Sequence, residues 1–128
     1  YGMTGGQMAP TTLIGEKTTT SPYGRTAERN GNPIRICEMM ATLSGTALAQ
    51  RVAIDSVPHI REAKKAIRKA FENEKEKRGL SIIEVLSTCP TNWGMSPTES
   101  MQFVKEKMIP YYPLGVYKDV TAEEGTKA

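Results

Sequence analysis

The sequence predicts an α/β fold in which two strands of a parallel sheet are joined by a helix. One observation is a stripe of apolar residues at helical spacing in residues 57–78. The other is a pair of apolar segments, 46–54 and 80–86, that lie on either side of this stripe. Strand, helix and strand in this order are typical of a right-handed crossover in one parallel sheet. We expect flanking helices and a long N-terminal loop around this unit.

The N-terminal loop, residues 1–32, is rich in glycine, threonine, serine and proline and has little hydrophobic periodicity. Connections of this length inside a compact domain are usually functional or disordered. Gly5 and Gly6 are flanked by hydroxyl and amide side chains, a composition that lets a backbone close on a bulky ligand. We interpret the loop as facing a cofactor. Because the chain opens on Tyr1, we expect it to be a fragment of a larger subunit.

An alternative is that residues 3–8 are a phage-derived epitope tag, which would have to be left out of any argument about the fold. That tag has two glutamines before its second methionine, whereas only Gln7 precedes Met8 here. Residues 9–13 also continue without a cloning linker. The segment is therefore interpreted as native.

The first predicted helix follows Asn32 and Pro33, which provide a cap and a first-turn proline, and it ends at Gly45. Its apolar residues recur at helical spacing, and its methionines are expected to fill the core. These residues are Ile36, Met39, Met40 and Leu43. The next element, 46–54, has apolar residues at even spacing and is predicted to be a strand.

The second predicted helix, 57–78, begins at Asp55 or Ser56 with Pro58 and ends at Gly79. Its lysines, arginines and glutamates are expected to face outward, opposite one apolar stripe. The stripe consists of Ile60, Ala63, Ile67, Ala70 and Phe71.

Residues 80–86 form a nearly continuous apolar run, which is typical of a strand covered on both faces. Ser96 and Glu99 then match a capping box with a proline between them, and the helix that follows is expected to end before Pro110. Its buried side is predicted to carry Met101, Val104, Met108 and Ile109. From Lys118 the chain is charged and small, so we expect a frayed tail.

The charge balance argues against a nucleic-acid partner. Lysine and arginine number 17 against 14 aspartates and glutamates, a formal net charge of +3, and most basic residues alternate with acids in 61–78. No apolar stretch approaches the length of a membrane span, and the start lacks the pattern of a signal peptide. We therefore expect a cytoplasmic protein with no membrane partner.

The two cysteines are far apart and suggest neither a disulfide framework nor a self-contained zinc site. Cys89 lies in the segment 87–94 that directly follows the second strand, at the sheet edge where ligands of parallel sheets lie. It is compatible with a packed residue, a nucleophile or a metal thiolate, and Pro90 would free it from a regular ladder. On the residues alone, packing is favoured. Cys37 lies on the apolar side of its helix and is expected to pack.

Three other residues are expected to be structural. His59 lies in the first turn of a helix, and no nucleophile or carboxylate pattern accompanies it. Glu84 interrupts an apolar strand, so its carboxylate must find donors or a cation, either as a structural acid, which we favour, or as a site contact. Trp93 is expected to anchor packing.

Three segments in this order and spacing, 1–12, 18–25 and 84–93, resemble the beta subunit of 2-oxoacid:ferredoxin oxidoreductases. The resemblance extends over almost the whole chain and implies the C-terminal part of a parallel-sheet thiamine diphosphate-binding domain. Within it, residues 1–32 would be the cofactor loop region, 33–117 the α/β core and 118–128 the tail. Members of this family decarboxylate a 2-oxoacid oxidatively to acyl-CoA and pass electrons to ferredoxin, and branched-chain 2-oxoacids or 2-oxoglutarate are the expected substrates.

The resemblance also implies which residues meet the cofactors. It places the Mg²⁺-binding positions before Tyr1, so neither a Mg²⁺ ligand nor a catalytic acid or base is expected in this chain. Cys89 matches the position of an iron–sulfur cluster ligand whose three companions lie elsewhere in the subunit. The cofactor wall is assigned to the first seven residues, which are Tyr1, Gly2, Met3, Thr4, Gly5, Gly6 and Gln7.

The partners implied are an alpha subunit and other subunits, ferredoxin, coenzyme A and the 2-oxoacid. Two alternatives remain open. One is a non-catalytic α/β module for protein contact, in which the loop is merely flexible. The other is a thiamine diphosphate enzyme that does not use ferredoxin.

Overall fold

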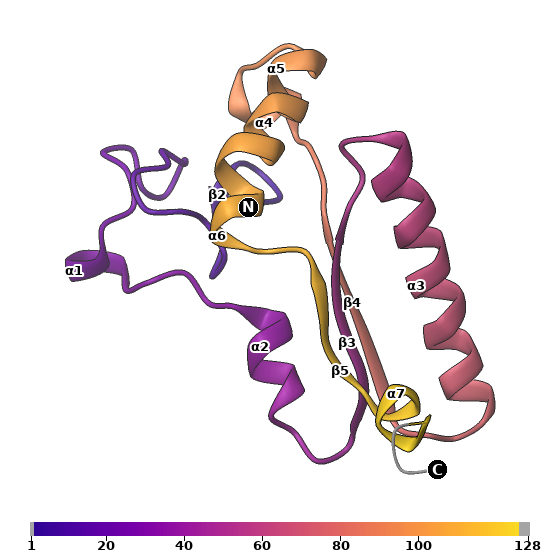
Figure 1. Cartoon of the computed structure of the whole chain (residues 1–128). Coiled ribbons are helices and arrows are strands. Elements are labelled where there is room, and N and C mark those ends of the chain that lie inside the picture. The colour runs from indigo at the N-terminus through magenta and orange to yellow at the C-terminus, as the bar shows by residue number, and fades with distance from the viewer. Residues whose placement is uncertain (1, 126–128) are drawn as a thin grey trace.

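A computed structural model describes residues 2–125 of the chain and shows a three-stranded mixed sheet with helices on both faces (Figure 1). Strand β3 (Thr46–Ala53) lies in the centre, between β4 (Leu80–Leu86) and β5 (Gly115–Asp119). β3 and β4 are parallel and are joined through helix α3 (Val57–Lys75). The predicted α/β fold with a parallel strand–helix–strand unit is confirmed.

The third strand adds an antiparallel neighbour to the parallel pair and corrects the expectation of a tail that frays from Lys118. β5 runs antiparallel to β3, and Lys118 and Asp119 are its last residues. Its side chains attach it to other elements: Lys118 donates to the carbonyl of Leu43, and Asp119 pairs with Lys69 of α3. A short helix, α7 (Val120–Gly125), follows. Charged residues therefore fasten this strand, which is why its composition resembles that of a tail.

Helix α3 packs on one face of the sheet through small side chains. Ala63 and Ala66 are buried against Val52 of β3 and the partly buried Ile83 and Val85 of β4. The predicted apolar stripe is correct at Ala63 but wrong at the large residues: Ile60 and Ile67 are exposed, and Phe71 is 73 % exposed. Alanines allow the helix to approach the strands closely, so that the larger apolar side chains lie outside the contact.

Strand β4 is the other edge of the described sheet, and this corrects the expectation of a strand covered on both faces. Leu80 is exposed, residues 81–85 are half-buried, and only Leu86 is fully buried. The central strand β3 is instead the buried one, with only Gln50 half-exposed along its length. The apolar run at 80–86 is thus not covered on its outer side by the described residues.

The second face of the sheet carries the main core and the C-terminal helices. Helix α4 (Pro90–Trp93) is followed by α5 (Pro97–Phe103), whose predicted capping box between Ser96 and Glu99 is present. A π-helical segment (Val104–Met108) and α6 (Ile109–Tyr111) continue the helix past Pro110, contrary to the expected end. The wider π turn adjoins a proline that lacks the N–H of a regular helix.

This helix faces a core cluster formed by Leu13, Ala53, Leu86, Val104, Met108 and Tyr112. Val104 and Met108 are buried as predicted, but Met101 is 47 % exposed. The cluster includes Leu13, so the N-terminal loop belongs to the core.

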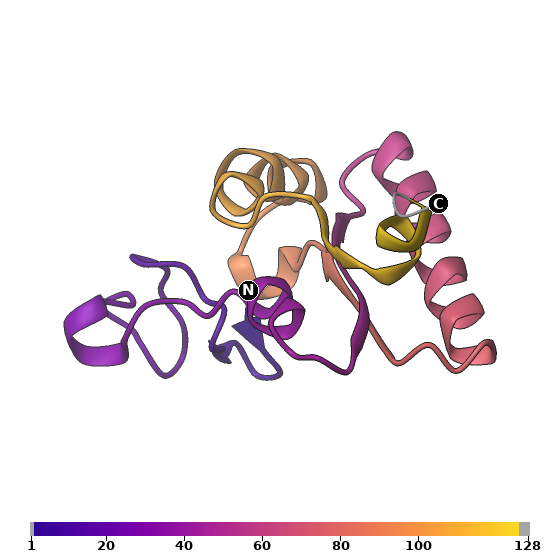
Figure 2. The ribbon, with the colours of Figure 1, turned by 60° about the horizontal axis from the view of Figure 1, so that its bottom comes forward.

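The N-terminal region is more regular than expected. It contains two short strands, β1 (Gly2–Met3) and β2 (Gln7–Met8), and a one-turn helix, α1 (Ala27–Asn30). Helix α2 (Ile36–Ala41) begins later than predicted, with Arg35 as its N-cap, so that Pro33 lies outside it. Figure 2 shows the loop extending away from the sheet on the side opposite to α3.

None of the helices in residues 2–125 is both long enough and apolar enough to cross a membrane.

Candidate functional site

The glycine pair closes a tight hairpin at the start of the described chain. β1 and β2 are antiparallel, with Gly2 opposite Met8 and Met3 opposite Gln7. Gly5 and Gly6 lie in the turn with φ of 77° and 69°, in the left-handed region that favours glycine. The glycines are therefore required by the backbone of the turn itself. Tyr1, the first residue expected at the cofactor wall, lies outside the described residues.

The hairpin is held by a second turn from residues 18–21. The Thr19 N–H donates to the Gly6 carbonyl at 2.9 Å, and the Thr19 hydroxyl donates to the Gly5 carbonyl at 3.2 Å. The Met8 N–H donates to Thr20 Oγ1 at 3.0 Å. Successive threonines thus satisfy polar backbone groups in the turn of the hairpin and on β2.

The third segment at this place follows the end of β4. A Cβ atom on Gly6 would lie 3.2 Å from Asn92 Oδ1 and 3.4 Å from Thr19 Cγ2. Glycine is thus also required because the hairpin backbone approaches Asn92 closely. The resemblance noted in the sequence involves segments 1–12, 18–25 and 84–93. Described residues of all three segments meet at the carboxyl end of β4.

Two hollows adjoin this meeting point. A small one of about 30 Å³ is lined by residues of the hairpin, by Glu16, Lys17 and Thr18, and by Asn92 and Trp93. A larger one of about 470 Å³ shares four of these residues and adds apolar ones, among them Leu13 and Phe103. Trp93 packs on Phe103 with ring centroids 4.8 Å apart. The expected packing role of Trp93 is confirmed, and its ring also lines both hollows.

Cys89 is exposed, which contradicts the packing role favoured from the residues alone. It caps α4 without a side-chain hydrogen bond, directly beyond β4. Within residues 2–125, no three histidine, cysteine or acidic side chains lie close enough to hold a metal ion. The described part of the chain therefore offers one accessible thiol and no complete metal site.

Cys37 is fully buried, as expected. Burial, and then a hydrogen bond with Glu84, raises the pKa of the Cys37 thiol to about 12. A thiol in this state is neutral at physiological pH and is a poor nucleophile.

His59 has a carboxylate partner, contrary to the expectation from the sequence. Its Nδ1 lies 2.6 Å from Asp55 Oδ1, and the Asp55 side chain is only 5 % exposed. The Ser56 hydroxyl accepts from the His59 N–H and caps α3. The pair fastens the first turn of α3 to the end of β3, so the structural role holds although the partner was missed.

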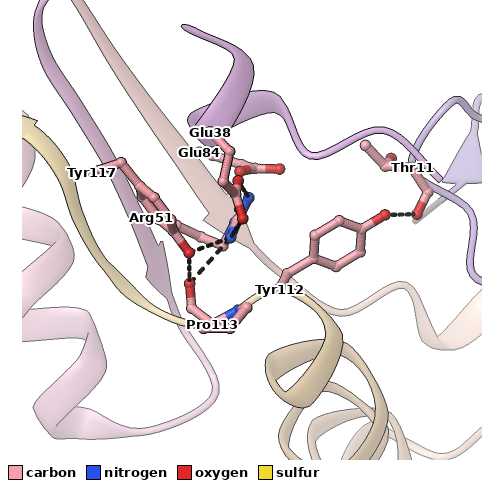
Figure 3. A network of polar contacts seen from close by, with 7 residues as sticks. All are labelled: Thr11, Glu38, Arg51, Glu84, Tyr112, Pro113 and Tyr117. Atoms are coloured by element: carbon pink, nitrogen blue, oxygen red, sulfur yellow. Dashed lines mark hydrogen bonds and ion pairs between the residues drawn. The ribbon is translucent and has the colours of Figure 1, made fainter. Parts of the chain in front are cut away.

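Glu84 is a structural acid, as favoured from the sequence, because Arg51 on the neighbouring strand pairs with it. Arg51 lies opposite Glu84 in the register of β3 and β4, and its Nε donates to Glu84 Oε2 at 2.7 Å. Its two terminal nitrogens donate to the carboxylate of Glu38 on α2, at 3.2 and 2.5 Å. Figure 3 shows this guanidinium between the two acids and Tyr117.

The hydrogen bonds of Arg51 join all three strands of the sheet and helix α2. Arg51 Nη1 also donates to the Pro113 carbonyl and to the Tyr117 hydroxyl, and Tyr117 donates to Pro113. Burial alone would lower the pKa of Arg51, but hydrogen bonds with Glu38 and Glu84 outweigh it and raise the pKa above its ordinary value. Burial would raise the pKa of Glu38, but the hydrogen bonds from Arg51 and the backbone lower it overall. Arg51 was not predicted as a structural residue, although a single arginine inside an apolar strand was the available signal.

No family model matches the chain. It is similar to ketoisovalerate oxidoreductase subunit VorA of Methanothermobacter thermautotrophicus, with 42 % identity over 123 residues that cover 96 % of the chain and 26 % of the relative. The 2-oxoglutarate synthase subunit KorB of Methanocaldococcus jannaschii is 36 % identical over 97 % of the chain and 42 % of the relative. KorB of Archaeoglobus fulgidus is 34 % identical over 97 % of the chain and 46 % of the relative. The chain thus spans between about a quarter and about half of these relatives, and no solved structure matches it.

Proposed function

Because the chain belongs to the family of 2-oxoacid oxidoreductase subunits, we propose that it forms the C-terminal part of the thiamine diphosphate-binding beta subunit of a 2-oxoacid:ferredoxin oxidoreductase. The complete enzyme converts a 2-oxoacid, coenzyme A and oxidised ferredoxin to an acyl-CoA, carbon dioxide and reduced ferredoxin. A branched-chain 2-oxoacid is the first choice of substrate, because the relative at 42 % identity is named for ketoisovalerate. 2-Oxoglutarate, named in relatives at 34 and 36 % identity, is the second.

The observation that carries this proposal is the meeting of the hairpin, the 18–21 turn and Asn92 of α4 at the carboxyl end of β4. Ligands of parallel α/β sheets bind at this edge. Three sequence motifs of the proposed family therefore lie together in space, although they are separated along the chain.

The described hairpin fits the role of a cofactor wall. Gly2, Thr4, Gly5 and Gln7 are exposed, so the turn presents backbone amides and short polar side chains without bulk. Residues 2–125 offer no cluster of metal ligands, so the Mg²⁺ that anchors the diphosphate would be held outside them. When bound, thiamine diphosphate supplies the carbanion chemistry of decarboxylation. The chain's own residues would limit the space around it and exclude water.

Cys89 is proposed as one thiolate ligand of an iron–sulfur cluster in the intact subunit. Its exposure just beyond β4 makes the sulfur accessible to ligands from other segments. One cysteine cannot hold a cluster, so three further thiolates must come from elsewhere. Residues 1–32 would then be the cofactor loop region of this domain, and the α/β core that begins at residue 33 would extend beyond 117 to the end of β5 at Asp119.

The test is a reduction assay on the complete enzyme that contains this chain. Ferredoxin reduction is expected only when 2-oxoacid, coenzyme A and thiamine diphosphate with Mg²⁺ are all present, and 3-methyl-2-oxobutanoate should be a better substrate than 2-oxoglutarate. Decarboxylation without iron or ferredoxin reduction would favour a thiamine enzyme of another kind. Absence of thiamine diphosphate binding by the complete enzyme would favour the non-catalytic module.

A further inference from the structure

The guanidinium of Arg25 is buried inside the N-terminal loop and is surrounded by main-chain carbonyl oxygens. Arg25 is 3 % exposed. Its Nη1 donates to the carbonyls of Ala9, Pro10 and Thr12, at 3.0, 2.9 and 2.8 Å. Its other nitrogens donate to residues 30–32, with Nε to Gly31 at 3.0 Å and Nη2 to Asn32 at 3.0 Å and Asn30 at 3.4 Å. One side chain thus joins segments 9–12 and 30–32.

The backbone of Arg25 holds a third segment. Its N–H donates to the Glu16 carbonyl at 2.9 Å, and its carbonyl accepts from the Gly15 N–H at 2.8 Å. Next to it, a Cβ on Gly24 would lie only 2.8 Å from the Gly15 carbonyl oxygen, and Gly24 has φ of 92°, so the close approach depends on glycine. Residues 9–12, 15–16 and 30–32 are all fixed relative to Arg25.

The hairpin is connected to Arg25 in two ways, through Ala9 and through the 18–21 turn. Ala9, whose carbonyl Arg25 holds, directly follows β2. The 18–21 turn, which binds the hairpin through Thr19 and Thr20, lies between residues 15–16 and Arg25 along the chain. The position of the glycine hairpin relative to the core therefore depends on Arg25.

We propose that Arg25 is the positioning residue of the hairpin: it holds the glycine turn in its binding geometry before the cofactor arrives. This inference rests on the proposed function. A loop that is already ordered loses little conformational entropy when the ligand binds. The affinity is therefore higher although no contact has been added. Arginine suits the task because its planar fork presents five donors in fixed directions, whereas lysine has three donors at one point.

The experiment uses the complete enzyme with Arg25→Lys, Arg25→Met and, as a matched control, Arg29→Met. Arg29 lies four positions further on and is exposed. For Arg25→Lys we expect the Kd of thiamine diphosphate, measured by calorimetry with Mg²⁺, to rise at least tenfold. Amide exchange at Met8 and Thr19 in the cofactor-free enzyme should be faster. Turnover should return to the wild-type value when the cofactor is saturating, because only binding is affected.

A role in folding alone would lower the amount of active enzyme, and saturating cofactor would not restore turnover. That result, or an unchanged Kd in Arg25→Lys, would overturn the inference. If Arg25→Met does not fold, the lysine variant still decides. If the wild-type enzyme itself binds no thiamine diphosphate, the proposed function fails, and unchanged amide exchange in Arg25→Lys would show separately that Arg25 does not position the hairpin.

Discussion

Arg51 links three elements through one side chain, since its fully buried guanidinium on β3 pairs with Glu84 of β4 and Glu38 of α2. Removing it leaves Glu84, only 8 % exposed, without its cation. We expect Arg51→Met to lower the free energy of unfolding by about 3–5 kcal/mol, the cost of an uncompensated buried charge. Urea denaturation measures this. The double variant Arg51→Met with Glu84→Gln should recover part of the loss, and equal stability of both variants would contradict the argument.

The same network gives an acid-dependent stability. The pKa of Glu38 lies below its ordinary value of 4.5, so the folded state binds a proton less readily than the unfolded chain. This contribution is fully present above pH 4.5 and is lost as the pH falls through the lower, folded pKa. Burial would raise the pKa of Asp119, but hydrogen bonds from Lys69 and Thr121 lower it overall. This second contribution is fully present above the ordinary pKa of 3.8 and is lost as the pH falls through the lower, folded pKa. Glu38→Gln should flatten the pH dependence of urea midpoints below pH 4.5, and an unchanged slope would show that Glu38 does not titrate with folding.

The two cysteines provide an internal comparison at the residue scale. In the complete enzyme, Cys89→Ala should lower iron content and stop ferredoxin reduction, because loss of one thiolate opens the cluster. Cys37→Ala removes a buried thiol and should reduce stability while leaving iron per folded subunit unchanged. Iron and labile sulfide are measured on both. An iron content in Cys89→Ala equal to that of the wild-type enzyme would show that Cys89 is a surface residue and not a cluster ligand.

Among the elements, the hairpin depends on glycine for two separable reasons. Gly6 needs both a left-handed backbone and space beside Asn92, whereas Gly115 at the start of β5 has φ of 151° and open space around its missing Cβ. Gly115→Ala should therefore cost about 1–3 kcal/mol for the backbone alone. Gly6→Ala adds displacement of the hairpin from Asn92, so thiamine diphosphate binding by the complete enzyme should weaken only in this variant. Thermal unfolding and calorimetry together separate the two, and equal affinities would exclude the hairpin from the site.

The strands and helices also show which elements can be predicted from local sequence patterns alone. The segments at 46–54, 57–78 and 80–86 were predicted with boundaries close to β3, α3 and β4, because each has a strong period and a clear end signal. The buried side of α3 was misassigned because periodicity identifies an apolar stripe, and here the sheet contacts its alanines. β5 was missed because its contacts are charged and distant in sequence.

At the scale of the whole molecule, the chain holds a hairpin and an exposed thiol but no metal cluster within residues 2–125. The 128-residue chain alone is therefore expected not to bind thiamine diphosphate tightly, because residues 2–125 offer no group of ligands for the Mg²⁺ that would anchor the diphosphate. Calorimetry with Mg²⁺ should show no heat of binding, and the complete enzyme is the positive control. Micromolar affinity of this chain would refute its assignment as one part of a larger site.

The sequence by itself determined the α/β class, the parallel strand–helix–strand unit, the capping box and the family, since each depends on residues near one another or on motifs in order. The tertiary structure decided which side chains meet. Arg51 faces Glu84 only through the register of two strands, Gly6 meets Asn92 across most of the chain, and Arg25 reaches segments on both sides of itself. Such contacts depend on how the elements pack, because a local period specifies the face of an element but not the partner that covers it.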